Sequence, residues 1–164
     1  MSLNQAEFRY ALGHYASGIT VVTSHHAGYN HGTTVSAFCS LSLNPPLVLI
    51  CIDHLSRSHD LIITSSVFGV NILAEQDEWI SRHFARRDQA KFADVAHYMG
   101  QLGVPLLENA LATLECRLVS HYSEGDHSIF IGEVLTTSVA QDKQPLIHFQ
   151  GSYNRLASHV TSTR

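Results

Sequence analysis

Residues 33–52 read TTVSAFCSLSLNPPLVLICI and contain two strand-like segments separated by a break in the chain. The first segment, 33–38, is rich in β-branched and small residues, which is typical of a strand. Pro45 and Pro46 interrupt the chain, and residues 47–52 are apolar on both faces, as in a central strand of a barrel or sandwich. This stretch therefore predicts the middle of a β-rich domain.

Further strands are expected on both sides of this stretch. Residues 19–23 form a β-branched run that a polar turn, from Ser24 to Gly32, connects to residues 33–38. The other segments with strand character are 67–73, 114–119 and 129–139. The last two flank the turn residues 123–126 and give the clearest hairpin in the chain, whereas residues 93–110 are ambiguous.

Three helices are expected between and before the strands. Asn4 followed by Glu7 is a helix-start pattern, and Phe8, Ala11, Leu12 and Tyr15 share one face of the helix that follows. Two more helices are expected at about 57–65 and about 75–85, the latter with Trp79, Ile80 and Phe84 on one side. Because strands and helices do not alternate regularly, the pattern favours a mainly β fold with a few helices, built as a small barrel in one domain spanning 1–164.

The composition excludes several classes of protein. Charged residues make up 15% of the chain and the formal net charge is -4, so no global positive field is available to hold nucleic acid. No run approaches the ~18 apolar residues of a membrane span, and the first residues lack the pattern of a signal peptide. We therefore expect a cytoplasmic protein that binds neither nucleic acid nor membrane.

Cysteine and histidine spacing argues against structural metal or disulfide chemistry. Cys39, Cys51 and Cys116 lie far apart and form no C-x-x-C pair, so they are interpreted as buried reduced thiols. The 12 histidines invite a metal interpretation, but none of their spacings matches a known ligand pattern. No metal site is expected.

Two segments have features of a phosphate site. Arg82, Arg86, Arg87 and Lys91 fall within ten residues, whereas the first 81 residues contain only Arg9 and Arg57 as Lys or Arg. This cluster is either a solvated helix face or a phosphate clamp. The segment 56–59 offers hydroxyls, a guanidinium and free backbone N–H groups at an expected helix start, which suits a phosphate or a simple N-cap.

The segment 32–37 has small hydroxyl residues in place of large apolar ones. A flat ligand such as an isoalloxazine ring needs backbone donors and acceptors along one edge and small side chains beneath it, and this segment can supply both. A threonine-rich edge strand is the alternative explanation.

These residues stand in an order that resembles the flavin reductase family of FMN-binding split-barrel proteins, the reductase components of two-component flavin-dependent monooxygenases. The resemblance covers Phe8 to Leu156, and its landmarks are residues 8–13, 16–23, 34–46, 68–73 and the Gly125-Asp126-His127 turn before 132–134. It implies an NAD(P)H:flavin oxidoreductase with an FMN-binding split β-barrel fold. It also implies a homodimer with FMN or FAD at its interface, NADH or NADPH as electron donor, and transient transfer of reduced flavin to a separate oxygenase.

The resemblance assigns site residues as well. It places the ring along Thr33, Thr34, Val35, Ser36 and Ala37 and along Cys51, Ile52 and Asp53; the phosphate or adenine end at Ser56, Arg57, Ser58, His59, Phe84, Ala85, Arg86 and Lys91; and His127 and Tyr153 near the nicotinamide. The sequence departs from the family at Tyr15, where Phe is commoner, and at Arg57, where a small residue is commoner. The second departure leaves the choice between FMN and FAD open.

His127 is the expected catalytic residue, placed to orient the substrate and to offer a hydrogen bond or positive charge beside the flavin; its alternative role is to cap a hairpin turn. The chain has no G-x-G-x-x-G, so the nicotinamide is expected to fold over the flavin in an open cleft. Two other functions stay open: a flavin-dependent oxidase of the pyridoxamine-oxidase type, which the Gly-Asp-His turn disfavours, and a non-catalytic FMN-binding electron carrier.

Overall fold

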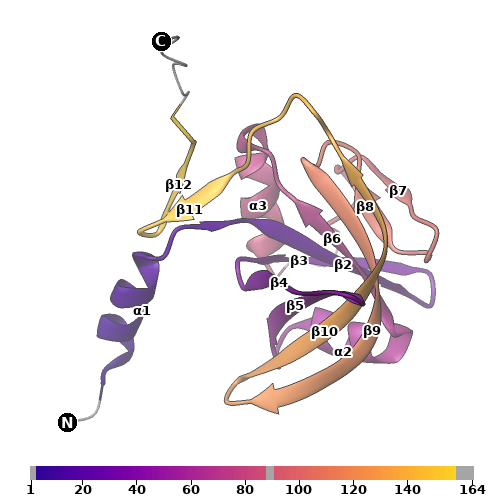
Figure 1. Ribbon diagram of the computed structural model, residues 1–164, viewed down its shortest axis with the longest axis horizontal. Coiled ribbons are helices and arrows are strands. Elements are labelled where there is room, and N and C mark those ends of the chain that lie inside the picture. The colour runs from indigo at the N-terminus through magenta and orange to yellow at the C-terminus, as the bar shows by residue number, and fades with distance from the viewer. Residues whose placement is uncertain (1–2, 88–90, 158–164) are drawn as a thin grey trace.

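The computed structural model describes residues 3–87 and 91–157 (Figure 1). The helical elements are α1 (Gln5–Gly13), α2 (Arg57–Ser65), the 3-10 turn η1 (Glu75–Asp77) and α3 (Glu78–Ala85). The strands are β1 (Ser17–Gly18), β2 (Thr20–His26), β3 (Tyr29–Val35), β4 (Phe38–Leu43), β5 (Pro46–Asp53), β6 (Val67–Ile72), β7 (His97–Met99), β8 (Pro105–Leu107), β9 (Ala112–Glu124), β10 (His127–Val139), β11 (Ile147–Phe149) and β12 (Ser152–Asn154). The expected mainly β fold with a few helices is confirmed.

One seven-stranded antiparallel sheet dominates the molecule, in the order β3-β2-β6-β9-β10-β5-β4. Its two edge strands, β3 and β4, are consecutive in the chain and are joined only by Ser36 and Ala37. Two edges joined by so short a connection have to lie close together, so the sheet curls round on itself. The curled sheet is the barrel, and its split lies where residues 33–37 pass from one edge to the other.

The interior of the curled sheet and its outer face each hold an apolar cluster. Successive residues of a strand point to opposite faces, so Val22 packs inside with Phe68 and Phe130, whereas Val21 packs outside with Phe84 of α3. Because α3 covers this outer face, β2 is buried on both sides. Burial of apolar surface in these two clusters favours folding through the hydrophobic effect.

Helix α2 closes the interior of the barrel beside the split. Ser56 is its N-cap and accepts a hydrogen bond from the Ser58 backbone N–H at 3.3 Å, and Ser66 ends the helix in the left-handed conformation at φ 57°. Ile62 of α2 is fully buried in the interior cluster. The start of α2 is thereby held next to the end of β5.

Helix α1 stands away from the barrel, connected through the small sheet β1-β11-β12 (Figure 1). Asn4 and Glu7 form the expected capping box. None of the nine residues of α1 is buried, and Phe8, Tyr10 and Leu12 are at least half exposed. The apolar face expected for this helix is therefore not covered by other residues within the described part of the chain.

Two expectations about local structure are wrong. The polar turn expected from Ser24 to Gly32 is only Ala27 and Gly28, both at positive φ, because the β2–β3 ladder continues outward to His26 and Tyr29. Trp79 is 53% exposed and does not share the buried side of α3, which belongs to Ile80 and Phe84.

The expectation of three buried thiols is also wrong, because only Cys116 is buried. Cys39 is exposed on the edge strand β4, and Cys51 is half-buried on β5. Among the described residues no helix is long and apolar enough to cross a membrane. The expected single domain over 1–164 extends past the described residues at 1–2, 88–90 and 158–164 and stays a prediction.

Candidate functional site

Two adjoining cavities open at the split of the barrel. The first, here called the strand cavity, has a volume of about 200 Å³ and is lined by Thr33, Thr34, Val35, Ser36, Ala37, Cys51, Ile52, Asp53, Ser56 and His127. The second, the cationic cavity, has a volume of about 390 Å³ and is lined by His31, Thr33, Asp53, Leu55, Ser56, Arg57, Ala85, Arg86, Arg87 and Lys91. Thr33, Asp53 and Ser56 line both, so the two cavities form one continuous site.

The strand cavity has walls of backbone and small side chains because it lies where β3 ends and β4 begins. The Phe38 N–H donates to the Ser36 carbonyl at 3.0 Å, and the Cys51 N–H donates to the Ala37 carbonyl at 3.1 Å. The Thr34 hydroxyl donates to the Ser81 carbonyl at 2.7 Å, which ties this segment to α3. A flat ligand can lie against such a rigid, shallow surface.

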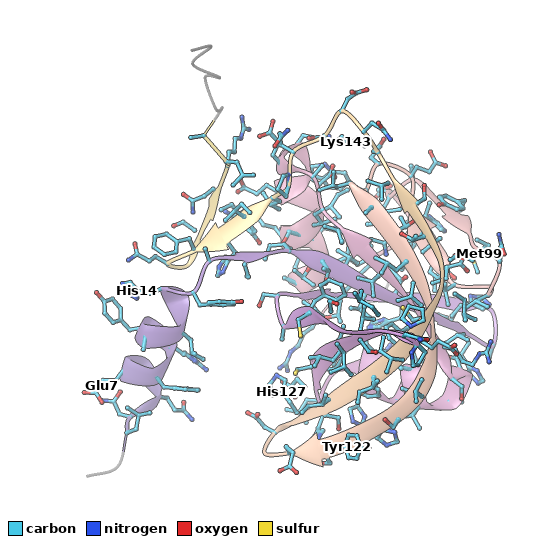
Figure 2. All side chains as sticks on the ribbon, viewed as in Figure 1. Glu7, His14, Met99, Tyr122, His127 and Lys143 are labelled. Atoms are coloured by element: carbon cyan, nitrogen blue, oxygen red, sulfur yellow. The ribbon has the colours of Figure 1, made fainter. Side chains whose placement is uncertain are left out.

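His127 stands at the rim of the strand cavity, at the first position of β10 (Figure 2). Its Nδ1 lies 2.7 Å from Oδ1 of Asp126, and the side chain is 46% exposed. This hydrogen bond from His127 is the main reason that the pKa of the Asp126 carboxyl lies below its usual range. With Nδ1 engaged in this way, Nε2 is the His127 nitrogen left for a ligand.

The cationic cavity gathers positive charge from three parts of the chain. Arg57 comes from the start of α2, Arg86 and Arg87 follow α3, and Lys91 lies beyond them, while Asp53 is the acidic side chain among the described residues of the lining. The four cations of this described lining make the cavity suitable for a phosphate or diphosphate. The N-terminus of α2 adds the favourable end of its dipole.

Lys91 is positioned by the fold itself. It is 5% exposed, and its Nζ donates to the carbonyl oxygens of Gly32 at 3.0 Å and Phe84 at 2.8 Å. The ammonium therefore links β3 to the end of α3 and sets its charge in the wall of the cavity. Lys91, which was expected to reach a ligand, therefore also holds β3 and α3 together.

His31 lies in the same cavity as a buried neutral base. Burial first, and then the charges of Lys91 and Arg57, lower its pKa from 6.5 to about 4. Its side chain shares a face of β3 with Thr33, two residues further along the strand. His31 is therefore uncharged at neutral pH, among four cations.

The structure brings together most of the residues that the sequence assigned to the site. Thr33–Ala37, Cys51–Asp53, Ser56, Arg57, Ala85, Arg86, Lys91 and His127 each line at least one cavity. Ser58, His59, Phe84 and Tyr153 line neither. Phe84 is fully buried, and the Tyr153 hydroxyl lies 2.8 Å from Ser81 Oγ. Direct contacts of these four residues with a ligand remain predictions.

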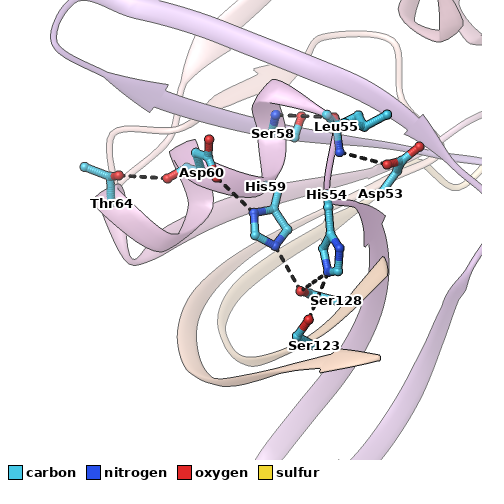
Figure 3. A network of polar contacts seen from close by, with 10 residues as sticks. Asp53, His54, Leu55, Ser58, His59, Asp60, Thr64, Ser123 and Ser128 are labelled. Carbon is cyan, nitrogen blue, oxygen red and sulfur yellow. Dashed lines mark hydrogen bonds and ion pairs between the residues drawn. The ribbon is translucent and has the colours of Figure 1, made fainter. Parts of the chain in front are cut away.

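His59 belongs to a polar network with His54, Ser123 and Ser128 (Figure 3). Its Nε2 lies 2.9 Å from Ser128 Oγ and its Nδ1 lies 3.0 Å from Asp60 Oδ1, while Nε2 of His54 also reaches Ser128 at 3.1 Å. The order Ser128, His59, Asp60 resembles a hydrolytic triad, but Ser128 is only 1% exposed, so no substrate reaches its hydroxyl. The network ties α2 to the β9–β10 hairpin.

Three residues of the lining were absent from the predicted site: His31, Leu55 and Arg87. Alternation along a strand could have indicated His31, since it precedes Thr33 by two positions. Arg87 stands beside Arg86 in the basic cluster, and Leu55 precedes the Ser56 cap. Among the described residues no three His, Cys, Asp or Glu side chains are placed to hold a metal ion.

Comparison with known proteins identifies the chain's relatives. Residues 12–157 match the model of the flavin reductase like domain. The reductase component of 4-nitrophenol 4-monooxygenase/4-nitrocatechol 2-monooxygenase from Rhodococcus opacus is 40% identical over 157 residues, covering 96% of this chain and 84% of the relative. An NADH-dependent flavin reductase from a Rhodococcus species is 38% identical over 151 residues, covering 90% and 84%.

Solved structures agree with these relatives. The NADH:FAD oxidoreductase SgcE6 of Streptomyces globisporus C-1027, in complex with NAD and FAD fragments, superposes with a TM-score of 0.92 at 33% identity, covering 98% of this chain and 99% of that one. The flavin reductase PheA2 gives a TM-score of 0.88 at 35% identity, covering 95% and 100%. The resemblance expected from the sequence is confirmed, and the chain belongs to the flavin reductase family.

Proposed function

We propose that this chain is an NAD(P)H-dependent flavin reductase that holds FMN or FAD across the strand cavity and the cationic cavity and supplies the reduced flavin to a separate monooxygenase component. The observation that supports this most directly is the continuity of the two cavities. A flat backbone-lined surface opens through Thr33, Asp53 and Ser56 into a space walled by four cations. The ring and the phosphate of a flavin need these two environments side by side.

The residues fit the parts of a flavin in turn. Backbone groups of residues 33–37 and 51–53 bind the ring edge, and Arg57 and Arg86 bind the phosphate. A bound flavin supplies the redox chemistry, as the acceptor of a hydride from a reduced nicotinamide. The protein contributes position and electrostatics, and none of its side chains serves as a nucleophile.

His127 is the residue proposed to act on the reacting groups. The Asp126 carboxylate accepts a hydrogen bond from Nδ1 at 2.7 Å, so the ring of His127 is oriented with Nε2 left for the ligand. Nε2 then offers a hydrogen bond or positive charge to the nicotinamide or to the ring edge as negative charge develops. Such a contact is stronger in the transition state than in the ground state, which is the condition for a rate effect.

Exchange of ligands is expected to be fast. The chain has no dinucleotide-binding G-x-G-x-x-G loop, so the nicotinamide binds transiently over the flavin. The reduced flavin then leaves for the oxygenase, which makes flavin a substrate as much as a cofactor. We place this reaction in the cytoplasm, where reduced nicotinamide nucleotides are available.

The proposed active form is a homodimer. Helix α1 exposes Phe8, Tyr10 and Leu12, and Leu43 at the end of β4 is 90% exposed. Apolar side chains grouped on one element that its own chain leaves uncovered are typical of a subunit interface. A second copy also encloses the flavin and nicotinamide more completely than one open cleft can.

Two measurements test this function. Steady-state rates with NADH and NADPH against FMN, FAD and riboflavin establish the activity and its preferences, and stopped-flow mixing with NADH under nitrogen is expected to bleach the bound flavin rapidly. A flavin that stays oxidised under these conditions would indicate an electron carrier. Turnover of pyridoxamine phosphate with oxygen, without NAD(P)H, would instead indicate the oxidase alternative.

A further inference from the structure

We propose that His31 binds the phosphate group of the flavin and takes up a proton from solvent as that phosphate enters the cationic cavity. The charge of His31 thus depends on the ligand, and binding of phosphorylated flavins is linked to pH. This inference rests on the proposed function, which places the flavin phosphate in the cationic cavity.

The position of His31 makes it a buried group directed at the ligand. It lies on β3 directly across the ladder from Ser24 of β2, and directly opposed residues point to the same face of a sheet. His31 is 6% exposed and lines the cavity, while Ser24 is fully buried and its hydroxyl has no hydrogen-bond partner. Among the described residues that line the cavity, His31 is therefore a buried base for which no hydrogen bond is seen, and the unpartnered hydroxyl of Ser24 lies beside it across the β2–β3 ladder.

Burial first, and then the positive charges around it, explain why His31 is neutral without ligand. Lys91 and Arg57 are the cations whose charges act on His31, and Arg86 and Arg87 line the same cavity from the end of α3. Among the described residues β5 contributes Asp53, and Ser24 of β2, directly across from His31, is uncharged. Buried close to these cations, an imidazolium has little water to stabilise it. The pKa of His31 accordingly lies at about 4.

A phosphate in the cavity reverses this balance. Its negative charge offsets the cations that oppose protonation of His31, and its oxygens accept a charge-assisted hydrogen bond from a ring N–H. The pKa of His31 therefore rises on binding, and a proton moves from the buffer to the ring. The affinity for a phosphorylated flavin therefore increases as the pH falls from 8 towards 5.5, because protonation of His31 in the complex costs less free energy at a higher proton concentration.

Riboflavin provides the internal comparison, because it has the same ring but no phosphate. Any proton taken up by His127 or another group near the ring occurs with riboflavin too, whereas uptake by His31 requires phosphate. FAD is the better phosphorylated probe, because the second ionisation of a phosphate monoester such as FMN lies near pH 6 and would itself exchange protons.

The experiment is isothermal titration calorimetry of the whole protein with oxidised FAD, FMN and riboflavin in paired buffers of different ionisation enthalpy, from pH 5.5 to 8. The expected result is net proton uptake with FAD that approaches one per site at the acid end, and none above the riboflavin value at pH 8. His31→Gln is expected to abolish this uptake. The matched control His26→Gln, at an exposed position beside the β2–β3 turn, is expected to retain it.

The outcomes separate the inference from the function on which it rests. If FAD binds more tightly than riboflavin but takes up no more protons at any pH, or if uptake persists in His31→Gln, the role of His31 is overturned and the proposed function stands. If FAD binds no more tightly than riboflavin, the phosphate site itself is absent and both fail. Should His31→Gln not fold, the comparison of FAD with riboflavin in the unaltered protein still decides the question.

Discussion

His127 lies directly opposite Asp53 across the β5–β10 ladder, so the residue proposed to act on the nicotinamide is paired with a residue that lines both cavities. Asp53 in turn accepts a hydrogen bond from the Leu55 N–H at 2.8 Å, at the entrance to α2. The His54 N–H donates to the Asp126 carbonyl at 3.0 Å. These bonds join the turn that holds His127 to the start of α2, where Arg57 is presented.

Substituting Arg57 by alanine is expected to weaken FMN binding without a matching loss in the rate of flavin reduction at saturation. A phosphate contact is equal in the ground and transition states, so it affects affinity more than the barrier. The loss is about 1.5–3 kcal/mol for a charge-assisted hydrogen bond, or roughly 10- to 150-fold in Kd. Fluorescence titration measures it.

Riboflavin binding serves as the control for Arg57→Ala and is expected to be unchanged. Arg117→Ala, which removes an exposed arginine from β9, is the matched surface variant and should leave both affinities as they are. An unchanged Kd for FMN in Arg57→Ala would show that Arg57 does not bind the phosphate, and the clamp would then be sought at Arg86 and Arg87.

The oligomeric state is predicted to depend on α1. Leu12→Glu places a charge on a helix whose apolar side chains the chain leaves exposed, and burying that charge in a subunit interface is costly. Sedimentation should show twice the 18.1 kDa chain mass for the unaltered protein and a shift towards one chain for the variant. Flavin bound to an 18.1 kDa species of the unaltered protein would contradict the dimer.

Stability is expected to fall in acid through His31. Its pKa in the folded state, about 4, lies below the ordinary value of 6.5, so the unfolded chain binds more protons and stability decreases as pH falls through this window. The contribution is about 2 kcal/mol at pH 5 relative to neutral pH. His31→Gln should flatten this part of the profile of urea-unfolding free energy against pH, and His26→Gln should not. Parallel profiles for the unaltered protein, His31→Gln and His26→Gln would refute this contribution of His31 to stability.

The close packing of β3 against α3 predicts the effect of a single methyl group. A Cβ at Gly32 would lie 2.6 Å from Cε1 of the buried Phe84 ring, whereas one at Gly18 would meet nothing within 4 Å. Gly32→Ala should therefore destabilise the fold by about 1–3 kcal/mol, the usual effect of overpacking. Gly18→Ala is the matched control in thermal melting. Equal melting temperatures would mean that Phe84 moves aside freely.

The sequence predicted the fold well because residues 33–52 impose strong local constraints. Small residues at 33–37 and an all-apolar strand at 47–52 indicated strands, and the barrel was predicted from many short strands without regular strand-helix alternation and from the resemblance to a known family. Local pattern does not show what a distant segment covers. Trp79 fits the helical period of α3 yet is exposed, and His31 looks like one of many histidines until the fold sets Arg57 and Lys91 around it. Predicted site residues that adjoin in sequence, such as 33–37 and 51–53, line one cavity together, and their contacts with a flavin stay a prediction.

Truncation of His127 to alanine should spare the fold, because the side chain is 46% exposed at the first position of β10 and its hydrogen bond runs to the neighbouring Asp126. The melting temperature should scarcely change, and flavin affinity should stay within a few fold. His127→Gln keeps a hydrogen-bond donor but not the positive charge, so it separates these two contributions.

The rate of flavin reduction by NADH is expected to fall in His127→Ala. Loss of a contact that strengthens as hydride is transferred is worth roughly 2–3 kcal/mol by analogy with oxyanion-type donors, or about 30- to 150-fold in rate. Stopped-flow absorbance under nitrogen measures this rate directly. An intermediate rate in His127→Gln would assign part of the effect to hydrogen bonding and the rest to charge. A preserved rate together with a lower melting temperature would instead make His127 a structural cap of the β9–β10 turn, and the acceleration would then have to come from ligand placement in the strand cavity alone.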